Sequence, residues 1–224
     1  MTDDHAVLFD LDDTLCTYRR GGAELLSVAF ERVGVEPLFT VEQYHERYPE
    51  FVDETEGIRD LRRACFVALA EDAGHDPEVG RAVEAAFADE RDHGNVDPVP
   101  GARDAVDHLA ADHRLGLVTN GSPEMQRQKL AGIGLADRFE TVVYAGYDAP
   151  GKPAPEPFHA ALDDLGVAPE RAVHVGNSLR SDVAGAHAAG VESAWLAGDD
   201  AANPDPTPDH RLASLRDLLD PPWR

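Results

Sequence analysis

Two aspartates, Asp10 and Asp12, stand two residues apart directly after the apolar run at 6–9. A short apolar run predicts a buried strand, and open α/β sheets bind their ligands at the carboxyl ends of the strands. Alternation along an extended chain would point both carboxylates to the same side, where they repel each other unless a cation or a shared proton intervenes. The pair therefore predicts a metal site.

Thr119 and Asn120 follow a second predicted strand, at 115–118. Ser122, two residues further on, is suited to cap a helix, and Pro123 is suited to its first position. Hydroxyl, amide and free backbone N–H groups at a helix start can bind an anion such as phosphate. Because Asn-Gly turns are common, this segment indicates little on its own.

Lys152 and the pair Asn177 and Asp182 lie in loops after two further predicted strands. Lys152 is one of two lysines among 20 basic residues, and a compact ammonium can bridge a carboxylate and a phosphoryl oxygen. A solvent-exposed lysine is the alternative. Asn177 and Asp182 offer hard oxygen donors suited to Mg²⁺, and helix capping by the serine and aspartate side chains of this segment is the alternative.

Short apolar runs alternate with helical patterns from residue 101 onward. Each crossover is long enough for a right-handed βαβ unit, so the sequence predicts an α/β fold with a doubly wound parallel sheet. Strands are expected at 5–11, 115–118, 141–144, 172–175 and 191–196, with helices at 101–113, 122–133, 155–165 and 181–189.

Residues 16–95 break this alternation. Apolar residues recur there at helical spacing, as at Leu61, Ala64 and Ala68, with no convincing strand between them. We expect an inserted helical cap domain at 16–95, and a core domain formed by 1–15 and 96–224. An insertion that begins beside the Asp-rich loop could act as a lid. A helical bundle without a gating role is the alternative.

The chain is strongly acidic, with 43 acidic residues, 20 basic residues and a net charge of −23. This charge is typical of proteins from salt-loving (halophilic) microbes, and an acidic mesophilic protein is the alternative. Nucleic acid and anionic membranes are poor partners for such a surface. We find no signal-peptide or membrane-spanning run, so a cytoplasmic location is expected. Cys16 and Cys65 do not form a disulfide framework and are expected to be buried thiols.

The four polar segments occur in an order that resembles the haloacid dehalogenase-like (HAD) hydrolase superfamily, in its branch with a helical cap that includes phosphoglycolate-phosphatase-like proteins. The family's DxDx(T/V) motif matches Asp10, Asp12 and Thr14. Its second motif, a Thr or Ser at a strand end, matches Thr119, and its loop lysine matches Lys152. Its fourth motif, GDSxxxDxxGA, matches the segment from Gly176 through Asn177, Ser178, Asp182 and Gly185 to Ala186.

The resemblance implies a Rossmann-like core and a Mg²⁺-dependent phosphatase acting on a small phosphorylated substrate, as a monomer or homodimer. Asp10 would attack phosphorus and form an aspartyl-phosphate, while Asp12 would act as acid and base and Lys152 would assist. Thr119 and Asn120 would bind the phosphate. Mg²⁺ would be held by Asp10, the backbone carbonyl of Asp12, Asn177 and Asp182. Because the family usually has Asp where this chain has Asn177, we expect weaker Mg²⁺ binding.

Three alternatives stay open. A 2-haloacid dehalogenase needs no metal and has no acid/base aspartate at the position of Asp12, which disfavours it. The motifs do not separate a phosphatase from a phosphomutase, and a non-catalytic binding or regulatory protein could keep the fold without turnover. Six residues could recognise a second anionic group of the substrate or belong to a solvated, ion-paired face: Tyr18, Arg19, Arg20, Arg59, Arg62 and Arg63.

Overall fold

The computed structural model describes residues 5–51, 55, 57–197 and 203–223. The chain divides into two compact units, one formed by Met1–Tyr18 with His93–Arg224 and the other by Arg19–Asp92. The first is the core unit and the second is the helical unit. The expected boundaries of the insertion, 16 and 95, lie three residues outside this division at each end.

The core unit contains a six-stranded parallel sheet with the strand order β5-β4-β1-β6-β7-β8. Its strands are β1 (Ala6–Phe9), β4 (Arg114–Asn120), β5 (Thr141–Ala145), β6 (Ala172–Gly176), β7 (Glu192–Leu196) and β8 (His210–Leu212). The predicted doubly wound parallel sheet is confirmed. Because β1 lies between β4 and β6, the carboxyl ends of these three strands are neighbours.

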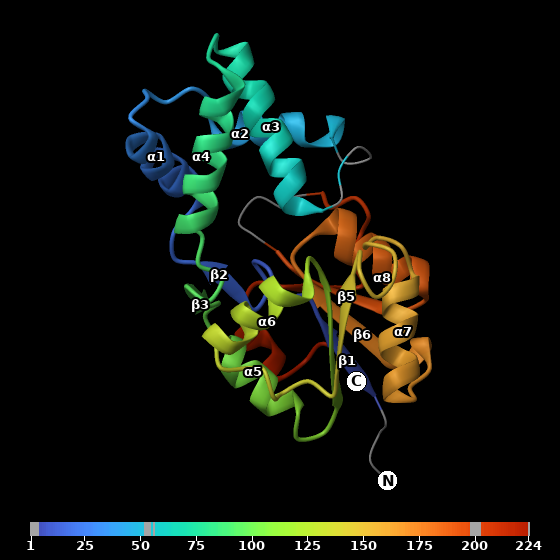
Figure 1. The fold of residues 1–224 in the computed structure, drawn as a ribbon. Helices are drawn as coiled ribbons and strands as arrows, with labels where there is room; N and C mark the ends of the chain where they lie inside the picture. Colours follow the sequence, from blue (N-terminus) through green and yellow to red (C-terminus); the bar gives the residue numbers. More distant parts are fainter. Residues whose placement is uncertain (1–4, 52–54, 56, 198–202, 224) are drawn as a thin grey trace. The chain divides into compact units, whose positions relative to one another are not determined.

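Helices cover both faces of the sheet, with α5 (Ala102–Leu109) and α6 (Pro123–Gly132) on one face and α7 (Glu156–Leu165) and α8 (Ala184–Ala189) on the other (Figure 1). Residues of β1 alternate between the two hydrophobic clusters. Val7 and Phe9 pack with α5 and α6, whereas Ala6 and Leu8 pack with α7 and α8. This strand is fully buried, which explains its continuous apolar run.

Several elements differ from the sequence-based expectation. The helix expected at 101–113 ends at Leu109, and the one expected at 181–189 begins as a π-helix, η4 (Leu179–Val183), before α8. A two-stranded antiparallel ribbon of β2 (Cys16–Tyr18) and β3 (Val96–Pro98) was not expected. Three-residue strands are too short to show a periodicity, which is why β2, β3 and the equally short β8 were not predicted. The remaining short helices of the core unit are η3 (Pro169–Arg171) and η5 (Leu215–Leu219).

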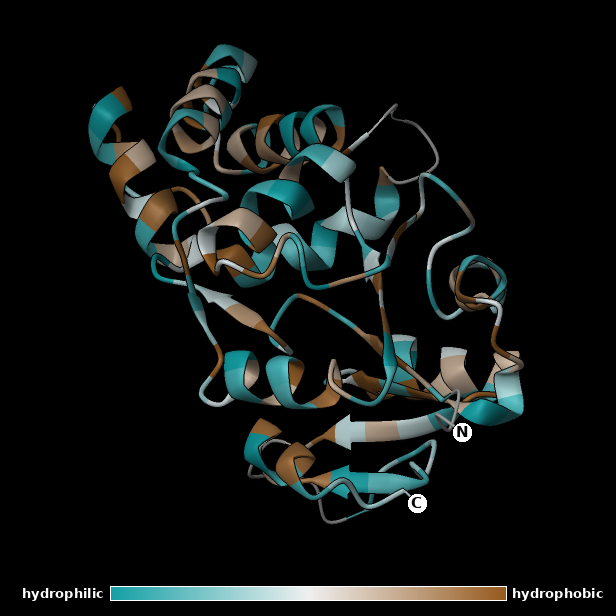
Figure 2. Ribbon diagram, turned by 90° about the horizontal axis from the view of Figure 1, so that it is seen from below, coloured by the Kyte–Doolittle hydropathy of each residue, from teal (hydrophilic) through white to brown (hydrophobic). Residues whose placement is uncertain are grey.

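The helical unit consists of α1 (Gly22–Val33), α2 (Val41–Arg47), η1 (Tyr48–Glu50), α3 (Ile58–Asp72) and α4 (Pro77–Glu90). Aromatic rings form its centre, with Phe66 in edge contacts with Phe39, Tyr44 and Phe87. Hydrophilic and hydrophobic residues alternate along the helical ribbons, as in helices with one polar and one apolar face (Figure 2). The described elements of this unit are helices, and its identity as a cap domain and its role as a lid stay predictions.

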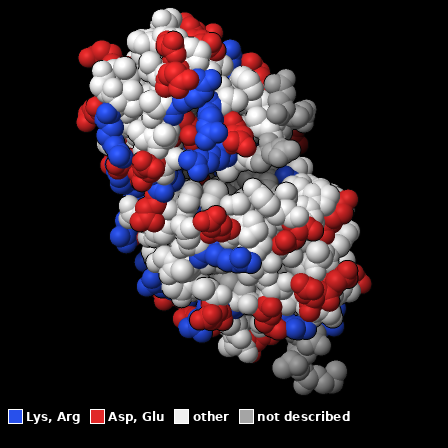
Figure 3. Space-filling model, in the orientation of Figure 1, with Lys and Arg blue, Asp and Glu red and all other residues white. Residues whose placement is uncertain are grey.

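Charged side chains lie between uncharged ones on the face shown in Figure 3, and acidic groups are spread widely over it. None of the helices in the described part of the chain has the length and apolar content that a bilayer-spanning segment requires. Cys16 and Cys65 are both free and buried, as expected.

Candidate active site

The carboxyl edge of the sheet brings the four predicted segments together. Asp10 follows β1 directly, and Thr119 and Asn120 end the neighbouring strand β4. Gly176 ends β6, on the other side of β1, and opens the loop that carries Asn177. These residues meet because parallel strands all end at the same edge, where open α/β sheets bind ligands.

Lys152 joins two of these segments through a buried ion-paired contact. Its Nζ lies 2.7 Å from Asp10 Oδ1 and 2.6 Å from Asp182 Oδ1, and it donates to the carbonyl of Val118 at 2.8 Å. The Lys152 side chain is 1% exposed. All three ammonium protons therefore have acceptors, which a buried cation requires.

Burial and charge oppose each other in this group. Burial raises the pKa of Asp10 to about 6, even though Lys152 acts to lower it. Burial also favours the neutral form of Asp182, but the His174 hydrogen bond and the Lys152 charge outweigh it and hold the Asp182 pKa below its usual range. For Lys152, burial acts to lower the pKa, and the two carboxylates raise it above normal. The site therefore favours a charged lysine beside an ionised Asp182.

Asn120 fixes the backbone of Lys152. Its side-chain Oδ1 accepts from the Lys152 N–H at 2.9 Å, and its Nδ2 donates to the Lys152 carbonyl at 3.2 Å. The side chain expected to bind phosphate is thus occupied in holding the lysine loop against β4. Phosphate binding by Asn120 stays a prediction.

Thr14 connects Asp10 with Asn177. Its buried hydroxyl lies 3.1 Å from Asp10 Oδ2 and 3.3 Å from Asn177 Oδ1. One hydroxyl proton can serve only one of these two acceptors at a time, so the hydroxyl cannot satisfy both oxygens. Among the described residues, no three or more His, Cys, Asp or Glu side chains are grouped so that they alone could hold a metal ion. A set of hard oxygen donors from carboxylate, amide and backbone nevertheless fits the preference of Mg²⁺.

Asp182 is held on both of its oxygens. Oδ1 faces Lys152 and lies 3.2 Å from His174 Nε2, while Oδ2 accepts from the backbone N–H of Ser178 at 2.9 Å. Burial lowers the pKa of His174, which favours the neutral ring, and with its proton on Nε2 that ring donates to the carboxylate. A Cβ at Gly176 would lie 2.4 Å from Asp182 Cγ, so only glycine admits this carboxylate so close to the strand end. Metal ligation by Asp182 stays a prediction.

Asp12 lies in a separate set of contacts that the sequence did not reveal. Lys129 Nζ lies 2.6 Å from Asp12 Oδ1 and 2.9 Å from Oδ2. Gln126 Nε2 donates to Asp12 Oδ2 at 2.8 Å and lies 2.6 Å from Thr119 Oγ1. Both residues come from α6, which begins at the predicted Ser122 cap. The scarcity of lysine, which drew attention to Lys152, applies equally to Lys129.

Several of the candidate arginines are ion-paired. Arg62 Nε and Nη2 both donate to the buried Glu84, and Arg63 pairs with Asp60. Arg20 pairs with Glu24 and Glu90. These ion pairs favour the ion-paired alternative for these arginines, and their contact with substrate stays a prediction. Arg59 is exposed, Tyr18 and Arg19 make other contacts, and substrate recognition by these three stays a prediction.

The fold defines an α/β protein with a Rossmann-like core, and comparison with known families shows the family to which it belongs. The haloacid dehalogenase-like hydrolase family matches residues 5–190. The chain belongs to this family.

Two curated relatives are phosphatases. The chain is 40% identical over 164 residues to phosphoserine phosphatase of Thermus thermophilus, a match that covers 71% of this chain and 64% of that enzyme. It is 30% identical over 224 residues to glyceraldehyde 3-phosphate phosphatase of Methanopyrus kandleri, covering 96% of this chain and 95% of that enzyme. The chain thus spans less than two thirds of the first relative and nearly all of the second.

Among solved structures, the putative HAD-hydrolase YfnB of Bacillus subtilis, crystallised with magnesium, has the same fold. The TM-score is 0.74, with 21% identity over 97% of each chain. This likeness supports the architecture described above.

Proposed function

We propose that the protein is a Mg²⁺-dependent phosphatase that hydrolyses a small phosphorylated metabolite, with Asp10 as the nucleophile. The observation that carries the proposal is that the two aspartates of the pair have different burial and different partners. Asp10 lies buried against Lys152, and Asp12, two residues away, lies half-exposed against Lys129 and Gln126. Two carboxylates in such different surroundings can take different roles.

The residues of the chain account for both halves of the reaction. An Asp10 oxygen would form a bond to phosphorus as the bond to the leaving oxygen breaks, and Asp12 would give that oxygen a proton. Water would then attack phosphorus, Asp12 would take its proton, and inorganic phosphate would leave with Asp10 restored. Lys152 would stabilise the charge on the phosphoryl oxygens, and the Thr119 hydroxyl would donate to one of them.

A metal ion completes this scheme. Asp10 Oδ2, the backbone carbonyl of Asp12, Asn177 Oδ1 and Asp182 are the donors that we expect to hold Mg²⁺. When bound, Mg²⁺ would neutralise the charge that gathers on the phosphoryl oxygens. The shared Thr14 hydroxyl supports this assignment, because two oxygen acceptors already converge there.

The alternatives fit the site less well. Dehalogenation does not need a second aspartate at the position of Asp12, whereas this chain holds that aspartate with two buried side chains. A binding protein without turnover would not need the nucleophile, acid and lysine together. Phosphomutase activity would use the same residues. It is distinguished from hydrolysis by its product, an isomeric phosphate ester in place of inorganic phosphate.

The test is a panel of small phosphate esters, including phosphoserine and glyceraldehyde 3-phosphate, assayed in molar KCl with Mg²⁺ or with a chelator. We expect release of inorganic phosphate that requires Mg²⁺ and is abolished in Asp10→Asn. Absence of hydrolysis by folded wild-type protein would favour the binding protein. Phosphate release that persists in the chelator would contradict the metal assignment.

A further inference from the structure

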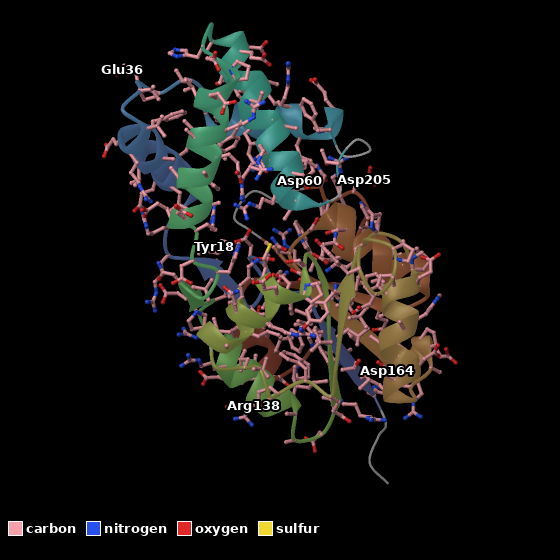
Figure 4. All side chains as sticks on the ribbon, in the orientation of Figure 1. Tyr18, Glu36, Asp60, Arg138, Asp164 and Asp205 are labelled. Carbon is pink, nitrogen blue, oxygen red and sulfur yellow. The ribbon has the colours of Figure 1, made fainter. Side chains whose placement is uncertain are left out.

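Lys129 forms an ion pair with Asp12, although it lies 117 residues further along the chain. Its ammonium contacts both carboxylate oxygens, and its side chain is 4% exposed while that of Asp12 is 41% exposed. The same ammonium lies 5.0 Å from the ring centroid of Tyr18, labelled in Figure 4. A buried lysine is costly unless it is paired. The fold thus keeps Lys129 buried at the one carboxylate of the pair that faces solvent.

Gln126 lies one helical turn before Lys129, so both side chains lie on the same face of α6. Its fully buried amide donates to Asp12 Oδ2, and its nitrogen is also within reach of Thr119 Oγ1 and the Asn120 carbonyl, at 2.6 and 3.0 Å. Its Oε1 is buried and has no hydrogen-bond partner among the described residues. Turning the amide over would place that oxygen against the Asp12 carboxylate, so the contacts made by Nε2 dictate its orientation.

These contacts restrict where the Asp12 carboxylate can go. A half-exposed aspartate would otherwise exchange among several rotamers. Proton transfer needs the carboxyl oxygen within about 2.6–3.2 Å of its partner, so only some rotamers are productive. Lys129 engages both oxygens and Gln126 engages one, which together fix both the direction and the tilt of the carboxylate.

We propose that Lys129 and Gln126 are positioning residues for Asp12, acting on the proton transfer to the leaving group. The same Gln126 nitrogen also donates to the Thr119 hydroxyl oxygen, so one amide orients the acid and leaves the Thr119 hydroxyl proton free for a phosphoryl oxygen. The inference rests on the proposed function. It adds two residues, on a helix outside the four motifs, to the machinery that performs it.

The test compares two esters by kcat/KM, which covers the steps up to departure of the leaving group. An alkyl phosphate needs a proton for its alcohol, whereas p-nitrophenyl phosphate releases a stable phenolate without one. For Lys129→Met we expect kcat/KM to fall roughly 10-fold to 100-fold for the alkyl ester and only by about 3-fold or less for the nitrophenyl ester. Asp12→Asn should show the same selectivity more strongly, and Gln126→Met more weakly.

Arg127→Met is the matched control, because it removes a positive charge from an exposed position on the same helix. This variant should leave kcat/KM unchanged for both esters. An equal loss for both esters in folded Lys129→Met, or no loss, would overturn the positioning role. Gln126→Met carries the same test should Lys129→Met fail to fold. If wild-type protein hydrolyses neither ester with Mg²⁺, the proposed function itself fails and the inference falls with it.

Discussion

Asp10 and Asp12 stand two residues apart, yet a different lysine binds each of them. Lys152 Nζ lies 2.7 Å from Asp10 Oδ1, and Lys129 Nζ lies 2.6 Å from Asp12 Oδ1. The chain has no other lysine. Two like charges that would repel each other therefore each have a cation of their own, which lets one carboxylate be buried while the other stays half-exposed.

Lys152 should be essential for stability as well as for activity. Lys152→Met would leave Asp10 and Asp182 facing each other in the interior without a cation. We expect a loss of about 3–5 kcal/mol in the free energy of unfolding, measured by urea denaturation in KCl with a chelator.

Arg138→Met is the comparison for that variant. It breaks an exposed pair with Asp107, in which the two side chains are 50% and 51% exposed. Exposed pairs contribute less than about 1 kcal/mol, so this loss should be small. Equal losses for the Lys152 and Arg138 variants would contradict the buried pairing.

Asn177 should limit the affinity for Mg²⁺. Asn177→Asp adds a negative charge next to Thr14 and Asp10, and we expect a several-fold lower apparent Kd for Mg²⁺, since charged ligands strengthen hard-cation sites. The measurement is a Mg²⁺ titration of wild type and variant, followed by activity and by calorimetry. An unchanged affinity would show that position 177 is not part of the metal site.

Asp209 should make stability sensitive to acid. Its Oδ2 accepts from the Ser193 N–H at 2.9 Å and the Ser193 hydroxyl at 2.8 Å, and it lies 3.1 Å from His187 Nε2. Although burial acts to raise the Asp209 pKa, these hydrogen bonds and the histidine outweigh it and lower the pKa below its ordinary value of 3.8.

A lowered folded-state pKa contributes stability that is fully present above the ordinary value and is lost as the pH falls through the folded value. Asp209→Asn should therefore lower the Tm at neutral pH and make the acid-side decline of Tm shallower. Melting curves from neutral pH down to about pH 3 measure both effects. Parallel curves for wild type and variant would refute the assignment.

The net charge of −23 should make the fold dependent on salt. Raising KCl from about 0.1 M to about 2 M shortens the screening length and should raise the Tm. Sucrose is the control, because it favours the compact state without screening charge. A Tm that responds to both additives alike would favour the ordinary acidic protein over the salt-adapted one.

The sequence predicted the sheet well because its strands are buried on both faces. The run at 6–9 is apolar throughout, and β4 and β6 have similar runs, so length and hydropathy were sufficient to locate them. The ribbon of β2 and β3 has only three residues in each strand and one buried residue at its start. Strands this short show no periodicity in the sequence, and each forms only by pairing with the other.

The site was predictable where a motif lies beside a strand end, and it was not predictable where residues meet through packing. Asp10, Thr14 and Lys152 fall in motif loops, and Asp10 contacts both of the others. Gln126 and Lys129 sit inside a helix and reach Asp12 across 114 and 117 residues. The orientation of α6 on the sheet makes those contacts, and no local pattern encodes it.

The central claim is that Asp10 carries the phosphoryl group. The most direct measurement is acid quenching of the Mg²⁺-loaded enzyme during turnover of a phosphate ester, followed by peptide mass spectrometry. We predict one added phosphoryl group on the peptide that contains Asp10, accumulating further in Asp12→Asn and absent in Asp10→Asn. A phosphoryl group on another residue, or undiminished turnover by Asp10→Asn, would contradict the account.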